Sequence, residues 1–164
     1  MDRNRARVRV VLVGLASLVF GIAATGVLQP TMEAQPAQAR RAIRPEKSPN
    51  TGLPYSPGIM VGNTLYVSGH LGRDPVTAKL VSGGIEAETR QSLANIREVL
   101  RTAGMDFTDV ASVTVFIASF EEFARFNAIY REVFPKDPPA RATVQVAALN
   151  DGARVELQMV AVKP

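Results

Sequence analysis

The order of helical and strand-like segments constrains the fold of this chain most. Apolar residues recur at helical spacing from Ile85 to Gly104 and again from Ser119 to Pro135, and each of these runs is followed by a β-branched segment. The two β-branched segments are residues 109–119, with the sequence DVASVTVFIAS, and residues 140–149. A strand–helix–strand order needs a crossover connection, which joins parallel strands. The pattern therefore predicts parallel pairing in the middle of the chain.

Other short segments complete a sheet. Residues 58–69 hold two apolar runs around Gly62-Asn63, a hairpin signal, and residues 78–84 are a short apolar run closed by glycines. A last strand is expected over residues 154–162. The resulting order, β-β-β-α-β-α-β-β, predicts an α+β domain with one mixed sheet and two helices on one face.

The helix boundaries also have sequence signals. Gly104 stands where a C-terminal cap belongs, and Pro135 marks the end of the second helix. Ser119 with Glu122 three residues later predicts a capping box. The expected buried stripes are Leu93, Ile96, Leu100 and Ala103 on the first helix, then Phe126, Tyr130 and Phe134 on the second.

The strands are apolar on both faces. If both helices cover one face of the sheet, the other face is left open, and an open apolar face favours self-association. We therefore expect a symmetric homo-oligomer. The strand residues that suggest this are Val113, Val115, Val144, Val146, Leu157 and Met159.

The N-terminal segment differs from the rest of the chain. Arginines precede an uncharged apolar run from Val10 to Leu28, and residues 37–39 read AQA. Residues 1–39 are thus expected to be either a signal peptide or an N-terminal membrane anchor, and both place the domain outside the cytoplasm, periplasmic or secreted. Residues 40–51 are assigned to a linker and residues 52–164 to the folded domain.

Charge and composition exclude several classes of function. Residues 48–164 carry 11 Lys/Arg against 12 Asp/Glu, a net charge of −1, so no nucleic-acid partner is expected. The chain has no cysteine and a single histidine, and it shows no metal-ligand spacing. We expect no metal and no cofactor, and we assign His70 to a turn rather than to catalysis.

A few polar residues stand in apolar strands. Arg141 follows Pro138-Pro139 and shares a strand face with Thr143 and Gln145, whereas Glu156 shares its face with Gln158, Val160 and Val162. Ser68 ends a strand. Each has a simple structural role available, as an edge charge, a solvated strand position or a turn serine, and the pattern alone leaves these alternatives open.

Several separated blocks resemble the Rid/YjgF family of reactive-intermediate deaminases. They are LPYSPGIMVGNTLYVSGHLGRDP, AETRQSLANIREVLRTAGMDFTDVASVTVFI, FARFNAIYREVF and PPARATVQVAAL with VELQMVAV, and together they span residues 50–163. The resemblance implies a chorismate-mutase-like (bacillus-type) fold and a homotrimer with a central barrel and clefts between subunits. It also implies hydrolysis of enamines and imines, such as 2-aminoacrylate and other 2-imino acids, to 2-keto acids and ammonia without a cofactor.

The resemblance also assigns roles. Arg141 matches the arginine that clamps the substrate carboxylate, and Glu156 matches the acid that holds or activates water. Tyr55, Ser68 and Asn127 match residues lining the same cleft, with Thr143 beside them contributing backbone groups.

This sequence departs from the family at a few positions. Thr143 stands where many members carry cysteine, and His70 and Gln158 replace a usual glutamine and glutamate. The alternative function is a non-catalytic trimeric binder of small carboxylate metabolites. A nuclease role, sometimes ascribed to the family, fits the charge of the domain poorly. The membrane is expected to be a partner only through the N-terminal segment.

Overall fold

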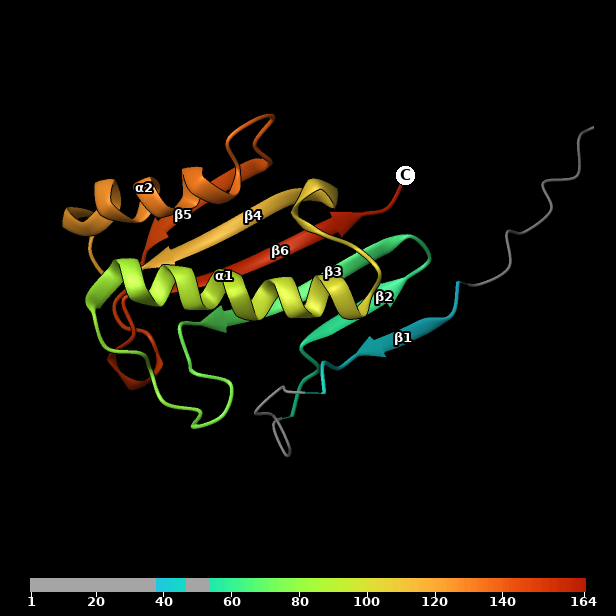
Figure 1. The fold of residues 1–164 in the computed structure, drawn as a ribbon, viewed down its shortest axis with the longest axis horizontal. Coiled ribbons are helices and arrows are strands. Elements are labelled where there is room, and N and C mark those ends of the chain that lie inside the picture. Colours follow the sequence, from blue (N-terminus) through green and yellow to red (C-terminus); the bar gives the residue numbers. More distant parts are fainter. Residues whose placement is uncertain (1–37, 47–53) are drawn as a thin grey trace, which may run out of the picture. The chain divides into compact units, whose positions relative to one another are not determined.

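The computed structural model describes residues 38–46 and 54–164, which form one mixed six-stranded sheet with two helices (Figure 1). Along the sheet the strands follow the order β1-β2-β3-β6-β4-β5. The α+β architecture predicted from the sequence is therefore confirmed. In chain order the elements are β1 (Arg40–Ile43), β2 (Gly58–Val61), β3 (Thr64–Leu71), α1 (Gly84–Thr102), β4 (Val110–Ile117), α2 (Phe123–Val133), β5 (Ala140–Gln145) and β6 (Val155–Val162).

Strand pairing follows the expected crossover. Strands β4 and β5, joined through α2, pair in parallel, and every other neighbouring pair in the sheet is antiparallel. Strand β6 inserts between β3 and β4, so the connection through α1 skips one strand. The last strand in the sequence is thus a central strand of the sheet.

The register determines what each sheet face carries. Val113 and Val115 of β4 pair with Met159 and Leu157 of β6, and all four are buried on the face that the helices cover. The alternate residues of β6, among them Glu156, therefore lie on the opposite face, which the described chain leaves open. Tyr66, Val144 and Val162 on this open face are 52%, 43% and 38% exposed.

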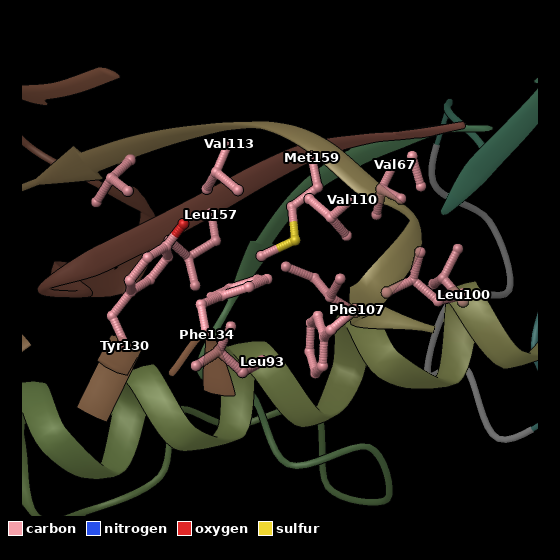
Figure 2. Packing of buried hydrophobic residues seen from close by; sticks show 14 of the residues in the cluster. Val67, Leu93, Leu100, Phe107, Val110, Val113, Tyr130, Phe134, Leu157 and Met159 are labelled. Atoms are coloured by element: carbon pink, nitrogen blue, oxygen red, sulfur yellow. The ribbon is translucent and has the colours of Figure 1, made fainter. Parts of the chain in front are cut away.

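The core lies between the helices and the covered face of the sheet. Leu93, Ile96 and Leu100 of α1 are buried there, as predicted, and so are Tyr130 and Phe134. Figure 2 shows these last two rings side by side beneath Val113 and Leu157, with their centroids 4.7 Å apart. Burial of this apolar stripe explains why the second helix forms where its sequence pattern predicts.

The ends of the helices differ in how well they were predicted. Gly104 adopts φ +74°, and the amides of Gly104 and Met105 bond the carbonyls of Arg101 and Leu100, which is a Schellman cap. The capping box predicted at Ser119 and Glu122 does not form, although Ser119 caps a short 3₁₀ turn, Phe120–Glu122, that precedes α2. The Ser119 hydroxyl does accept from the Glu121 amide (3.2 Å), but the Glu122 carboxylate binds Arg154 instead.

Two strand assignments need correction. Residues 78–84 form no strand, and the segment makes only an isolated bridge between Arg73 and Leu80, because Ala78, Gly83 and Gly84 adopt positive φ. Conversely, residues 40–43, assigned to a linker, form the edge strand β1, which pairs with β2.

The predicted leader, residues 1–39, lies almost entirely outside the described residues, as do linker residues 47–51. Within the described ranges, no helix is long and apolar enough to cross a membrane.

Candidate functional site

Arg141 lies on the edge strand β5 and reaches over α2. It pairs in register with buried Val113, so its side chain projects on the helix side of the sheet. There its guanidinium carbon lies 4.5 Å from the ring centroid of Tyr130, 5.5 Å from that of Phe126 and 5.7 Å from that of Phe123. Within residues 38–46 and 54–164, no carboxylate lies within salt-bridge distance of Arg141. The arginine is thus an exposed cation held on aromatic rings.

Asn127 and Thr143 flank this arginine. Asn127 lies one helical turn from Phe123 and next to Phe126, and therefore on the part of α2 that carries the rings beneath Arg141. Thr143 lies two residues from Arg141 on the same strand face, but its hydroxyl is buried and has no hydrogen-bond partner in the described chain. The hydroxyl of Thr143 is therefore not presented to a ligand, and any contact from this position comes from the backbone. We call Arg141, Asn127 and Thr143 the arginine half-site.

Glu156 lies elsewhere, on the open face of the sheet. With Tyr55, Ser68, Gly69 and Gln158 it lines a cavity of about 310 Å³. Burial raises the pKa of the Glu156 carboxyl above its ordinary value. A half-buried carboxyl with a raised pKa is a better proton acceptor than an ordinary surface carboxylate, and it can return the proton. We call this group of residues the glutamate half-site.

A β-bulge shapes the glutamate half-site. Val67 pairs with Met159 and His70 with Leu157, so that Ser68 and Gly69 together stand opposite Gln158. A Cβ atom on Gly69 would lie 1.8 Å from Oε1 of Glu156. Glycine here therefore leaves room for the Glu156 carboxylate in its present position, and it is not needed for a positive φ. The sequence analysis missed Gly69, although a glycine inside a strand pattern is a signal of a bulge.

Ser68 holds the segment that carries Tyr55. The Ser68 hydroxyl donates to the carbonyl of Ser56 (2.6 Å), and its amide donates to the carbonyl of Pro57 (2.9 Å). Tyr55 directly precedes Ser56 in the chain, lines the cavity and is 48% exposed. In this structure Ser68 therefore acts on the site by fixing the neighbouring segment.

Glu88 is a second residue that the sequence analysis missed. Glu88 is 5% exposed, and its carboxylate accepts from the amide of Arg154 (2.8 Å), immediately before β6 and two residues from Glu156. Burial is the main reason that the pKa of Glu88 is raised, and its contacts with the backbone and the charge of Arg154 oppose this effect. A buried acid on an amphipathic helix gives no distinctive pattern in the sequence, so it could not have been singled out.

His70, assigned to a turn, instead belongs to β3 and points to the covered face because of the bulge. Burial lowers its pKa to about 4, although contact with the backbone of Pro57 opposes this, so the imidazole is neutral at physiological pH. The Ser92 hydroxyl donates to the carbonyl of His70 (2.7 Å) and not to its ring. His70 thus lies on the covered side of β3, outside both half-sites.

The two half-sites do not meet in one copy of the chain. Arg141 lies on the helix side of the sheet at the β5 edge, and Glu156 lies on the open side of β6. The structure brings together Tyr55, Ser68 and Glu156, and separately Arg141, Asn127 and Thr143. No group of His, Asp or Glu residues suited to a metal ion occurs in the described part of the chain.

Comparison with known proteins assigns the family. Residues 45–163 match the family described as Endoribonuclease L-PSP, which is the Rid/YjgF family that the sequence resembles. The chain belongs to this family. The resemblance noted from the sequence blocks is therefore confirmed.

Individual relatives of this Rid/YjgF protein support the assignment. The 2-iminobutanoate/2-iminopropanoate deaminase of Homo sapiens is 44% identical over 124 residues, covering 76% of this chain and 90% of that protein. A Rid-family protein of unknown function from Yersinia pestis superimposes with a TM-score of 0.72 at 38% identity, covering 76% of this chain and all of the other. TdcF of E. coli, solved with bound serine, gives a TM-score of 0.71 at 28% identity, covering 76% of this chain and 99% of the other.

Proposed function

We propose that this protein hydrolyses reactive 2-imino acids, and the enamines from which they form, to 2-keto acids and ammonia. The observation that carries the proposal is the pair of complementary half-sites: an arginine free of any carboxylate partner within the described chain, and a half-buried glutamate of raised pKa in a cavity. The 44% identical human relative, which is named as a deaminase of 2-iminobutanoate and 2-iminopropanoate, supports this substrate class.

The proposal requires the half-sites to meet between copies. Strand β5 is an edge of the sheet, whereas Glu156 opens on the uncovered face. If the β5 edge of one copy packs against the open face of the next, Arg141 approaches the neighbouring Glu156 cavity, and repetition of this contact closes a ring. Burial of exposed Tyr66, Val144 and Val162 would stabilise such a ring. We propose a homotrimer with three such sites.

The chemistry needs one anion-binding group and one base. The Arg141 guanidinium has the fork of donors that matches the two oxygens of a carboxylate, and it would orient the imino acid. Glu156 would take a proton from water as the oxygen attacks the imine carbon, and it would return this proton to the nitrogen. The resulting carbinolamine releases ammonia and leaves the keto acid, so that one water is consumed for each C=N bond cleaved.

The direct test is hydrolysis of an imine generated in situ by an amino-acid oxidase, with ammonia release followed against the spontaneous rate. Arg141→Ala is expected to reduce hydrolysis to the spontaneous rate, because a small imino acid has few other groups through which the protein can bind it. Light scattering on the same samples checks that the oligomer persists. Unchanged hydrolysis by an intact Arg141→Ala oligomer would overturn the proposal.

The second candidate is a trimeric carboxylate-binding module without turnover. Bound serine in the TdcF structure favours it, because that protein holds an intact amino acid. Glu156→Gln separates the two candidates. In an enzyme this change should mainly lower kcat, whereas in a binder it should leave the affinity for a small carboxylate nearly unaltered and there would be no rate to lose.

We also propose that the N-terminal segment exports the domain. The apolar run from Val10 to Leu28 behind several arginines supports this proposal. Cell fractionation with N-terminal sequencing tests it. Cleavage near residue 39 would indicate a signal peptide, retention of residue 1 in the membrane fraction would indicate an anchor, and an unprocessed cytosolic protein would refute export.

A further inference from the structure

Arg141 differs in its surroundings from the arginines of the described chain that form ion pairs. Arg73, Arg90, Arg97, Arg125 and Arg154 each contact a carboxylate. Arg141 has no such contact in the part of the chain that the structure describes, and its guanidinium rests on three rings of α2 instead. A cation held by ring faces keeps its N–H donors unused, because an aromatic face occupies none of them in a hydrogen bond.

Tyr130 makes the closest of these contacts. Its ring centroid lies 4.5 Å from the guanidinium carbon, about one ångström nearer than those of Phe126 (5.5 Å) and Phe123 (5.7 Å). The Tyr130 ring is itself fixed, since it is 5% exposed and packs against Phe126 and Phe134 at centroid distances of 5.6 and 4.7 Å. Figure 2 shows the contact with Phe134. The arginine thus rests on a rigid support.

The hydroxyl of Tyr130 plays no visible part in this support. It is buried and has no hydrogen-bond partner among the described residues. Burial raises the pKa of Tyr130 to about 12, although the charge of Arg141 opposes this, so the phenol stays neutral and does not form an ion pair with the arginine. What Tyr130 offers to Arg141 is therefore its ring.

We propose that the Tyr130 ring is a positioning residue that acts through Arg141, holding the guanidinium over α2 with its donors free for the carboxylate of the ligand. The inference rests on the proposed function, in which Arg141 binds that carboxylate. An arginine without this ring would sample other rotamers and would have to be ordered when the ligand binds, which weakens binding.

Loss of the Tyr130 ring should change KM rather than kcat. The carboxylate of the substrate is equally present in the ground state and the transition state, so loss of its positioning should raise KM and leave kcat almost unchanged. A cation–π contact of this kind corresponds to an effect of roughly 3- to 30-fold in affinity. A merely structural role for Tyr130 would instead lower the fraction of active protein and hence the apparent kcat.

The experiment compares Tyr130→Leu with Tyr130→Phe and with a matched control, Phe134→Leu. Phe134 lies four residues further along the chain, packs on Tyr130 and is also buried, but within the described chain its ring makes no cation–π contact with Arg141. KM and kcat are measured for imine hydrolysis, and the affinity for 2-oxobutanoate, a non-reacting carboxylate, is measured by calorimetry on the full oligomer. Tyr130→Met serves as a second ring-deleted variant if Tyr130→Leu fails to fold.

We expect Tyr130→Leu to weaken 2-oxobutanoate binding and to raise KM about tenfold, and Tyr130→Phe to behave like the wild type. Folded Phe134→Leu loosens the packing of the Tyr130 ring but keeps the ring beneath Arg141, so its effect should be clearly smaller than that of Tyr130→Leu. Equal effects of Tyr130→Leu and Phe134→Leu, or a change in kcat alone, would overturn the inference. Arg141→Ala distinguishes this failure from that of the proposed function. If Arg141→Ala abolishes 2-oxobutanoate binding while Tyr130→Leu leaves this binding unaltered, only the positioning role of Tyr130 is refuted. If Arg141→Ala leaves binding intact, the proposed role of Arg141 in binding the carboxylate is refuted.

Discussion

The two half-sites are built by different means. In the arginine half-site, side chains hold the functional group: the Arg141 guanidinium rests on rings of α2, and the strand beneath it is regular. In the glutamate half-site, backbone geometry positions the groups around Glu156. It does so through a bulge at Ser68–Gly69 and through hydrogen bonds from Ser68 to the carbonyls of Ser56 and Pro57. A site held by packing should accept side chains of similar shape, whereas a site held by backbone geometry should not accept even one added carbon atom.

The largest effect is expected from Gly69→Ala. The added Cβ would lie 1.8 Å from Oε1 of Glu156, and this carboxylate must move because it is the flexible end of a side chain. We expect kcat for imine hydrolysis to fall by about 100-fold or more, since a displaced base loses most of its catalytic contribution. The free energy of unfolding should change by no more than about 1 kcal/mol. Wild-type kcat in Gly69→Ala would show that the position of Glu156 is not critical.

The pH dependence of stability tests the environment of His70, which the same bulge turns to the covered face of the sheet. His70 has a folded-state pKa of about 4 against an ordinary value of 6.5, so between these values the unfolded chain binds a proton that the folded chain does not. Stability due to neutral His70 is present above pH 6.5 and is lost as the pH falls through this range, by roughly 3 kcal/mol in total.

Urea unfolding at pH 7, 5.5 and 4 measures this loss, with His70→Gln as the control. Glu88 and Glu156, whose pKa values are raised, contribute in the opposite direction, but they do so equally in both proteins. The difference between the two slopes therefore isolates the histidine. Parallel pH profiles for wild type and His70→Gln would contradict the buried neutral imidazole.

Gly72→Ala also adds one carbon atom at a glycine in close contact, but it should change stability rather than catalysis. A Cβ at Gly72 would meet backbone atoms of Glu88, with Cα at 2.4 Å and the carbonyl oxygen at 2.6 Å, and a helix backbone cannot step aside as a side chain can. We expect a loss of about 1–3 kcal/mol in stability, measured by thermal or urea unfolding, from strain between β3 and α1. The folded fraction should retain near-normal kcat, in contrast with Gly69→Ala.

The smallest effect is expected from Ser68→Ala. It removes the hydrogen bond to the Ser56 carbonyl and should cost about 1 kcal/mol in stability. The Tyr55 segment should become more mobile, which hydrogen exchange at the amides of Tyr55 and Ser56 can detect. Faster exchange there with little change around Arg141 would confirm that the two half-sites are positioned independently, and equal changes in both would contradict it.

Regular helices and strands could be predicted from the sequence, whereas the bulge and the long-range contacts could not. Helices with a clear apolar stripe, the parallel pair β4 and β5 and the strand faces of Arg141 and Glu156 follow from periodicity, because alternation is regular there. Gly69, His70 and Glu88 were missed or misassigned because the bulge interrupts alternation and because the contacts of Glu88 join residues 66 positions apart in the chain. The sequence pattern predicted Phe126 and Tyr130 only as buried residues of the second helix. Their contact with Arg141 could not be predicted, because it depends on how β5 packs on α2.

The bulge also determines which residue β3 contributes to the interior at its far end. An uninterrupted strand continuing from Val67 would turn Leu71 inward and His70 outward, whereas here His70 pairs with inward-facing Leu157 and Leu71 pairs with Glu156 on the open face. The bulge, in which two residues of β3 oppose one of β6, thus shifts the alternation of the strand and places a histidine instead of a leucine on the covered face. Deletion of Gly69 would keep every later side chain on its present face, and it would yield a more regular strand with a differently shaped floor beneath Glu156.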